Sequence, residues 1–86
     1  MNMNGYAVWW QEGENRRHAG KLQLGLLHLL LSGNGSGRLA VPLDQIISVR
    51  YRRGELEIER RGGPYLRIGN LDGLGVLLEL SDALAA

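Results

Sequence analysis

The stretch from Ile46 to Arg61 constrains the fold most, because polar and apolar side chains alternate on both sides of Arg53-Gly54. Successive side chains of a strand point to opposite faces, so a period of two indicates half-buried β-strands. Glycine can supply the positive φ that a two-residue turn needs. The stretch therefore predicts an antiparallel hairpin of residues 46–52 and 55–61.

One register of this hairpin sorts both faces at once. It puts opposite charges on one side and apolar side chains on the other, and a shift of one residue would mix the two sets. We therefore expect the arginines to be largely neutralised by the glutamates that face them. The predicted pairs are Ser48–Glu59, Val49–Ile58, Arg50–Glu57, Tyr51–Leu56 and Arg52–Glu55.

Other segments also have the composition of strands. A turn at residues 62–64 would place Leu66 opposite Arg60 and Ile68 opposite Ile58. Residues 22–31 are almost continuously apolar, and leucine also favours helix. A buried strand is preferred there, because the run is short and a glycine-rich loop, residues 32–37, follows it. The further predicted strands are residues 6–10, 21–24, 38–41 and 65–69.

A C-terminal helix is predicted from a cap at Asn70 or Asp72 to about residue 85. Its main apolar stripe would face the core, and a second strip, Val76, Leu80 and Ala83, would lie beside it, partly exposed. That strip would be buried by self-association. The main stripe comprises Leu74, Leu77, Leu78, Ser81 and Leu84.

These elements predict a mainly β fold of six or seven antiparallel strands with one C-terminal helix. The 86 residues make a single domain, residues 1–86, of which residues 1–5 are expected to be disordered. Thirteen glycines favour many turns, and hence hairpins over a helical bundle.

This order of elements resembles the pleckstrin-homology-like (PH-like) superfold, including its bacterial and GRAM-type relatives. The resemblance rests on His18–Leu24, on Arg38–Val49 with its Pro-Leu-Asp and Ile-x-x-Val pattern, and on the hairpin and helix. It implies a barrel or orthogonal sandwich, one end of which is closed by the helix. It also implies a binding scaffold, whose ligand the fold alone does not name.

No arrangement of residues in the sequence indicates catalysis, so we expect a protein that is not an enzyme and needs no cofactor or metal. There is no cysteine, and the four serines lie in a loop, on a strand face or in the helix. His18 and His28 belong to different segments, and His28 is expected at the edge of the core. Glu55, Glu57 and Glu59 are interpreted as a charge ladder.

The formal net charge of +1 gives no general reason to bind nucleic acid, and none is expected. The longest apolar run, residues 22–31, is about half of the roughly 20 residues that a spanning helix needs. We therefore expect no transmembrane segment. Without a recognisable leader, a cytoplasmic location is expected.

Two surfaces remain as candidate binding sites. Trp9 and Trp10 are neighbours on one strand, so one is expected in the core and the other either at an interface or covered by a loop that packs over it. Together with the helix strip of Val76, Leu80 and Ala83, they favour an interaction module that binds a protein partner or forms a homo-oligomer. The alternative is peripheral binding to anionic lipid headgroups by the basic first loop, Arg16, Arg17, His18 and Lys21.

Overall fold

The computed structural model describes residues 5–33, 37–71 and 76–85. Within them the chain forms seven strands and a C-terminal helix, which confirms the predicted mainly β class. Gly5 belongs to the first strand, so the expectation of disorder is wrong for that residue, and residues 1–4 lie outside the described residues. The elements are β1 (Gly5–Glu12), β2 (His18–Leu24), β3 (His28–Gly33), β4 (Arg38–Pro42), the 3-10 helix η1 (Leu43–Gln45), β5 (Ile46–Arg52), β6 (Glu55–Arg60), β7 (Leu66–Asn70) and α1 (Val76–Ala85).

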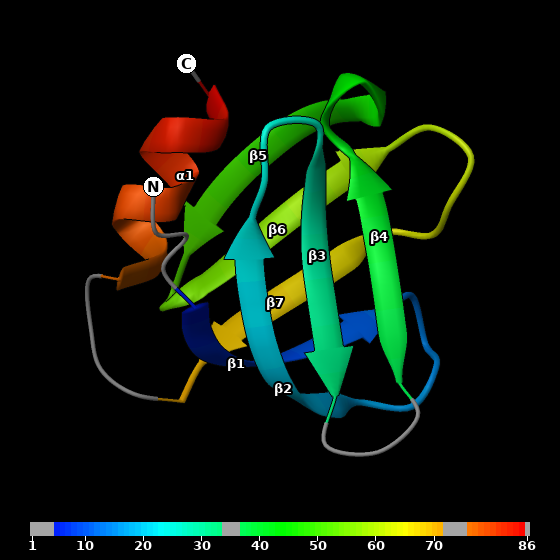
Figure 1. The fold of residues 1–86 in the computed structure, drawn as a ribbon, viewed down its shortest axis with the longest axis vertical. Coiled ribbons are helices and arrows are strands. Elements are labelled where there is room, and N and C mark those ends of the chain that lie inside the picture. The colour runs from blue at the N-terminus through cyan, green and yellow to red at the C-terminus, as the bar shows by residue number, and fades with distance from the viewer. Residues whose placement is uncertain (1–4, 34–36, 72–75, 86) are drawn as a thin grey trace.

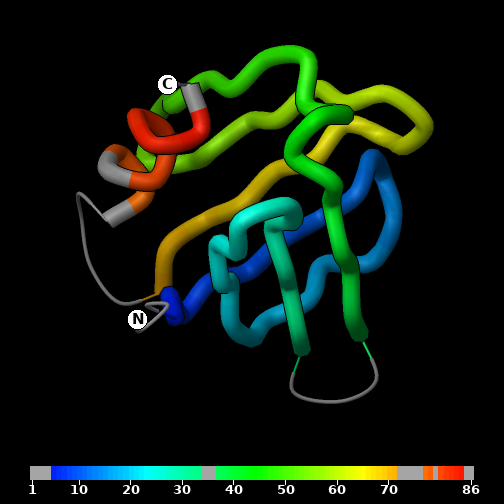
Figure 2. Tube along the Cα trace, turned by 45° about the horizontal axis from the view of Figure 1, so that its top comes forward, coloured from blue at the N-terminus to red at the C-terminus, as the bar shows by residue number. Residues whose placement is uncertain are grey.

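All the strands belong to one antiparallel sheet with the order β4-β3-β2-β1-β7-β6-β5. The sheet curls into a half-barrel, so that β2, β3 and β4 cross in front of β5, β6 and β7 (Figure 1). The edge strands are β4 and β5. Helix α1 packs mainly on β5 and also on β6 and β7, beside the curled sheet (Figure 2).

The concave face of the sheet and one side of α1 enclose the core. Each strand except β5 contributes fully buried side chains, and the half-buried β5 side chains pack against them. Apolar side chains thus fill the interior of the described part of the chain. The core includes Val8, Trp10, Leu22, Leu29, Leu31, Val41, Leu56, Ile58, Leu66, Ile68, Leu77 and Leu80.

The β5–β6 hairpin has the predicted register, including Arg50 opposite Glu57 and Val49 opposite Ile58. Its turn residues, Arg53 and Gly54, both have positive φ, at 53° and 78°. Such a turn matches the twist of the flanking strands. A register shift between Ile46 and Ser48 interrupts the alternation at the start of β5.

The preference for strand over helix in residues 22–31 is correct, but the run belongs to two strands, β2 and β3, and not to one. The chain reverses at Gly25, whose N–H donates to the carbonyl of His28 at 2.8 Å, and β2 pairs with β3 through Leu22–Leu31 and Leu24–Leu29. Leucine can occupy either face at no local cost, so the apolar run concealed the turn.

The register predicted for β6 and β7 is also wrong, by two residues. Ile58 pairs with Leu66, and Glu57 pairs with Arg67. Because a shift of two preserves which face each side chain occupies, Leu66 and Ile68 remain inside and Arg67 remains outside. The shift is possible because the connection between β6 and β7, residues 61–65, is longer than the predicted three-residue turn.

Helix α1 faces the core with most of the described part of the predicted main stripe, but the prediction is wrong for Leu78 and Leu80. Leu80 is only 2% exposed, whereas Leu78 of the predicted main stripe is 47% exposed. The buried side of the helix follows Leu77, Leu80 and Ser81, with Leu84 half-buried. Asn70 is the last residue of β7, and the other predicted cap, Asp72, lies outside the described residues.

Candidate functional site

The two tryptophans of β1 point to opposite faces of the sheet, as predicted. Trp10 is 1% exposed and lies in the core, so it offers nothing to a partner. Trp9 is half-buried and lies on the outer face, between the buried Val8 and Trp10. A strand with both neighbours of Trp9 anchored in the core holds that indole firmly on the outside.

Small residues on the neighbouring strands make room for Trp9. It pairs with Ala19 of β2 on one side and with Gly69 of β7 on the other. A Cβ at Gly69 would overlap the indole nitrogen and the adjoining ring carbons of Trp9. The indole therefore lies over the β7 backbone instead of standing away from the sheet.

Two arginines lie close to the indole. The Cζ of Arg17, from the β1–β2 loop, lies 3.8 Å from the centroid of the Trp9 ring. The Cζ of Arg67, on β7, lies 5.5 Å from it. Both distances are within the range of cation–π contacts. We call Trp9, Arg17 and Arg67 the Trp9 platform. Trp9 was predicted as an interface residue and Arg17 as part of the basic first loop, whereas Arg67 was not predicted as a site residue.

A hollow of about 270 Å³ adjoins the Trp9 platform on the same face. It is lined by Arg52 and Arg53 from the β5–β6 turn, Glu55 and Glu57 from β6, and Arg67. Arg67 thus belongs to both features. Across the sheet, Arg52 pairs with Glu55, and Glu55 pairs with Gly69, which lies beneath the indole of Trp9. We call this feature the charged hollow.

The two glutamates of the charged hollow are already engaged. Glu55 Oε1 accepts hydrogen bonds from Arg67 Nε at 3.1 Å and Nη2 at 3.0 Å. Partial burial raises the pKa of the Tyr65 hydroxyl, and its hydrogen bond to Glu57, with the negative charge there, raises the pKa further. Glu55 therefore has an arginine partner, whereas Glu57 has only the neutral hydroxyl of Tyr65.

The arginines of the β5–β6 hairpin are not neutralised as expected. In the described part of the chain, Arg50, Arg52 and Arg53 take part in no hydrogen bond and no ion pair within 4 Å. Glu55, which faces Arg52 across the hairpin, is paired with Arg67 instead. Arg52 and Arg53 therefore have no ion-pair partner within 4 Å in the described residues, although Glu55 and Glu57 line the same hollow.

The predicted basic set of the first loop is divided between two faces. Arg17 and Lys21 lie on the outer face, and Arg16 is exposed in the loop. His18 pairs with Trp10 and stacks on it with ring centroids 5.2 Å apart, on the inner side of the sheet. Because His18 points away from the other three, the four do not converge on one ligand.

The predicted helix strip does not form an exposed surface. Leu80 is part of the core, Ala83 is exposed, and the side chain of Val76 lies outside the described residues. The most exposed large apolar side chains are instead Leu26, at 95%, and Leu27, at 73%, in the β2–β3 turn. Only the glycine before them, Gly25, could have signalled that turn.

A second hollow, of about 480 Å³, lies over β3 and β4. Its lining includes Leu30, Ser32 and Ala40 with one charged residue, Arg38. It contains none of the predicted site residues, and its mainly apolar lining does not indicate a particular ligand or partner.

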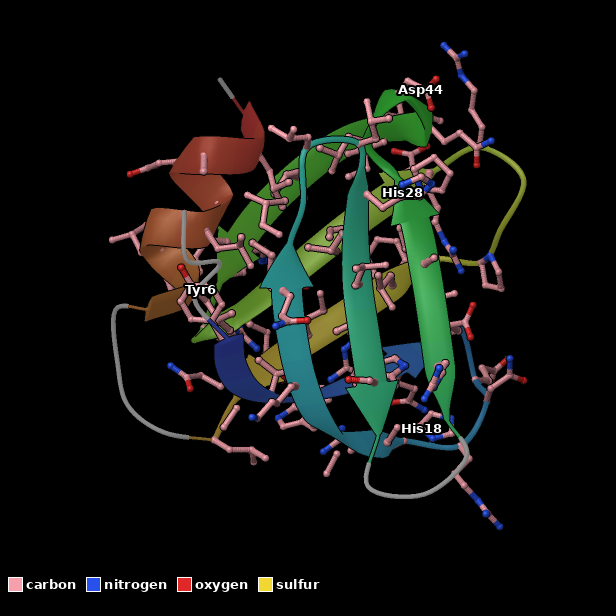
Figure 3. All side chains as sticks on the ribbon, in the orientation of Figure 1. Tyr6, His18, His28 and Asp44 are labelled. Carbon is pink, nitrogen blue, oxygen red and sulfur yellow. The ribbon has the colours of Figure 1, made fainter. Side chains whose placement is uncertain are left out.

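The two histidines lie at opposite ends of the curled sheet (Figure 3). His28 is exposed rather than at the core edge, because it begins β3 on the outer face. Among residues 5–33, 37–71 and 76–85, no three His, Asp or Glu side chains gather closely enough to hold a metal ion. Over the same residues, no helix has the length and hydropathy needed to cross a membrane.

No protein-family model, curated protein or solved structure matches the chain.

Proposed function

We propose that this protein is a non-catalytic interaction module of PH-like fold that binds a protein partner through the outer face of β1 and β7. The curled seven-stranded sheet with its C-terminal helix supports the assignment to the PH-like superfold. The single observation that carries the function is the Trp9 platform, an indole held in place on an outside face with two arginines within cation–π distance of its ring.

The chemistry of this platform is that of an interaction hot spot. Tryptophan, tyrosine and arginine are the residues most enriched among the dominant contacts of protein interfaces. An indole that is already fixed over Gly69 loses little conformational freedom when a partner covers it. A buried tryptophan such as Trp10 could not act in this way.

Self-association through the helix strip has lost its basis, because Leu80 is in the core. The lipid alternative keeps Arg16, Arg17 and Lys21 but loses His18, which stacks on Trp10. We therefore favour a partner of different sequence that covers Trp9.

The test compares proteins captured from a native lysate by the wild-type chain, by Trp9→Ala and by Leu78→Ala. Leu78 is exposed on the helix, away from β1, and serves as a matched apolar control. A partner retained by the wild type and by Leu78→Ala but lost from Trp9→Ala supports the proposal. Partners that Trp9→Ala retains in full contradict it.

The lipid alternative is separated by co-sedimentation with vesicles containing phosphatidylserine. Salt-sensitive binding that is lost in Arg16→Ser and Lys21→Ser, and unaffected by Trp9→Ala, would replace the protein-binding proposal. Both variants are at exposed positions, so the fold is expected to tolerate them.

A further inference from the structure

We infer that the charged hollow receives the carboxylates of an acidic segment of the protein partner, while the Trp9 platform holds the neighbouring part of that segment. This inference rests on the proposed function and adds the chemical class of the partner. It starts from an imbalance of charge within the hollow.

Three arginines and two glutamates line the charged hollow. Glu55 is held by Arg67, whereas Glu57 has only the neutral hydroxyl of Tyr65 beside it and keeps its negative charge, so the hollow has a formal surplus of one positive charge. Arg52 and Arg53 have no carboxylate within 4 Å in the described residues. An incoming anion therefore meets two guanidinium groups whose charge no neighbouring ion pair has used.

Guanidinium groups favour carboxylates because their planar donors match the two oxygens of the acid. The hollow's free donors come from adjacent residues at a hairpin turn, where the backbone is fixed by the positive φ of Arg53 and Gly54. Arg17 supplies a further guanidinium, 3.8 Å from the centroid of the Trp9 ring. Acidic side chains spaced along an extended segment could reach both places.

The same glutamates argue against a continuous polyanion. A nucleic-acid strand or a membrane surface presents closely spaced negative charges, and these would meet Glu55, Glu57 and Glu59 on the outer face of β6. A peptide can leave uncharged residues opposite the glutamates. The alternation of charge on this face therefore favours an acidic segment of a protein.

Binding is tested by titrating the ¹⁵N-labelled full chain with a synthetic peptide in which glutamate alternates with serine. The readout is the pair of indole N–H signals, of which Trp9→Phe identifies one and leaves the core signal of Trp10. The expected result is a saturable shift of the Trp9 signal that weakens with added salt. A peptide with glutamine in place of glutamate is expected to leave both signals unchanged.

Variants then locate the site. Arg17→Ser and Arg52→Ser are each expected to weaken peptide binding about two- to five-fold, as the loss of one exposed ion pair does. Arg53→Asn is expected to do the same, because asparagine tolerates positive φ and keeps the turn. Arg38→Ser removes the same charge from the exposed strand β4 and is the matched control, with no expected change.

Three results would overturn the inference. The first is the absence of a shift of the Trp9 signal at saturating peptide. The second is an equal loss of binding in Arg38→Ser, which would indicate a non-specific charge effect. The third is tighter binding of an oligodeoxythymidylate or an anionic vesicle through the same arginines.

The outcome is independent of the test of the proposed function. If Trp9→Ala loses a partner from the lysate but the acidic peptide does not bind, then only the acidic class is wrong. If the peptide binds but no captured partner depends on Trp9, then the platform is not the protein interface and the proposed function fails.

Discussion

The indole of Trp9 lies over Gly69, on the neighbouring strand β7, at a position where any larger residue would collide with it. Trp9 is the centre of the proposed binding surface, and Gly69 is the residue that decides how the indole is placed. A methyl group on Gly69 should therefore change both the stability of the fold and the binding of a partner through Trp9.

We expect Gly69→Ala to lower the free energy of unfolding by about 1–3 kcal/mol, the usual cost of overpacking. Urea denaturation followed by circular dichroism measures this loss. Gly5→Ala is the control, since its Cβ would make only ordinary contact with Lys21 on the outer face of the same sheet. Equal stabilities for the two variants would mean that Trp9 does not occupy the space over Gly69.

Leu80→Glu should prevent folding instead of changing the oligomeric state. The side chain is buried against β5–β7, so the substitution loses an apolar contact worth about 2–5 kcal/mol and buries a carboxylate without a partner. Leu78→Glu, on the exposed side of the same helix, should change stability by less than about 0.5 kcal/mol. Circular dichroism and sedimentation of the two variants distinguish the roles, and a folded Leu80→Glu protein would contradict the helix orientation.

The ion pair of Glu12 and Arg60 should contribute more to stability than that of Glu55 and Arg67. Arg60 Nη2 lies 2.5 Å from Glu12 Oε2 with only 8% of the Arg60 side chain exposed, and Arg60 Nε also donates to the Pro64 carbonyl at 2.9 Å. Both side chains of the second pair are about one-third exposed, where water screens the attraction.

Double-mutant cycles in urea measure this difference. The cycle of Glu12→Gln and Arg60→Met should give a coupling free energy of about 1–3 kcal/mol. The cycle of Glu55→Gln and Arg67→Met should give about 0–1 kcal/mol and should decline with salt. A reversed order would show that the end of the sheet near Pro64 is not held by Arg60.

Leucines in and next to the β2–β3 turn should differ in how much their substitution lowers the free energy of unfolding. Leu26→Ser and Leu27→Ser should leave the unfolding free energy within about 0.5 kcal/mol of the wild type, because both side chains are exposed. Leu29→Ala should cost about 2–5 kcal/mol, because that side chain is fully buried. Urea midpoints for the three variants check this, and a large loss at Leu26 would restore the single buried strand over residues 22–31.

The local sequence pattern was sufficient to predict strand pairing where charged and apolar side chains alternate between the two faces of a strand. The β5–β6 register could be predicted because the two-residue turn at Arg53 and Gly54 set it, and a shift of one residue would have placed charge in the core. The opposite orientations of Trp9 and Trp10 followed from the pleat of a strand, although which one is inside did not. In residues 22–31 there was no such contrast, since leucine fits either face, and the turn at Gly25 was missed.

The sequence by itself determined that the chain is a series of antiparallel strands followed by a helix, because side-chain periodicity is a local property. Only the tertiary structure decided which side of α1 faces the core, since that depends on how the helix meets β5. It alone also placed Arg17 and Arg67 within cation–π distance of Trp9. Those residues come from three separate segments, and their distances are set by the curl of the whole sheet.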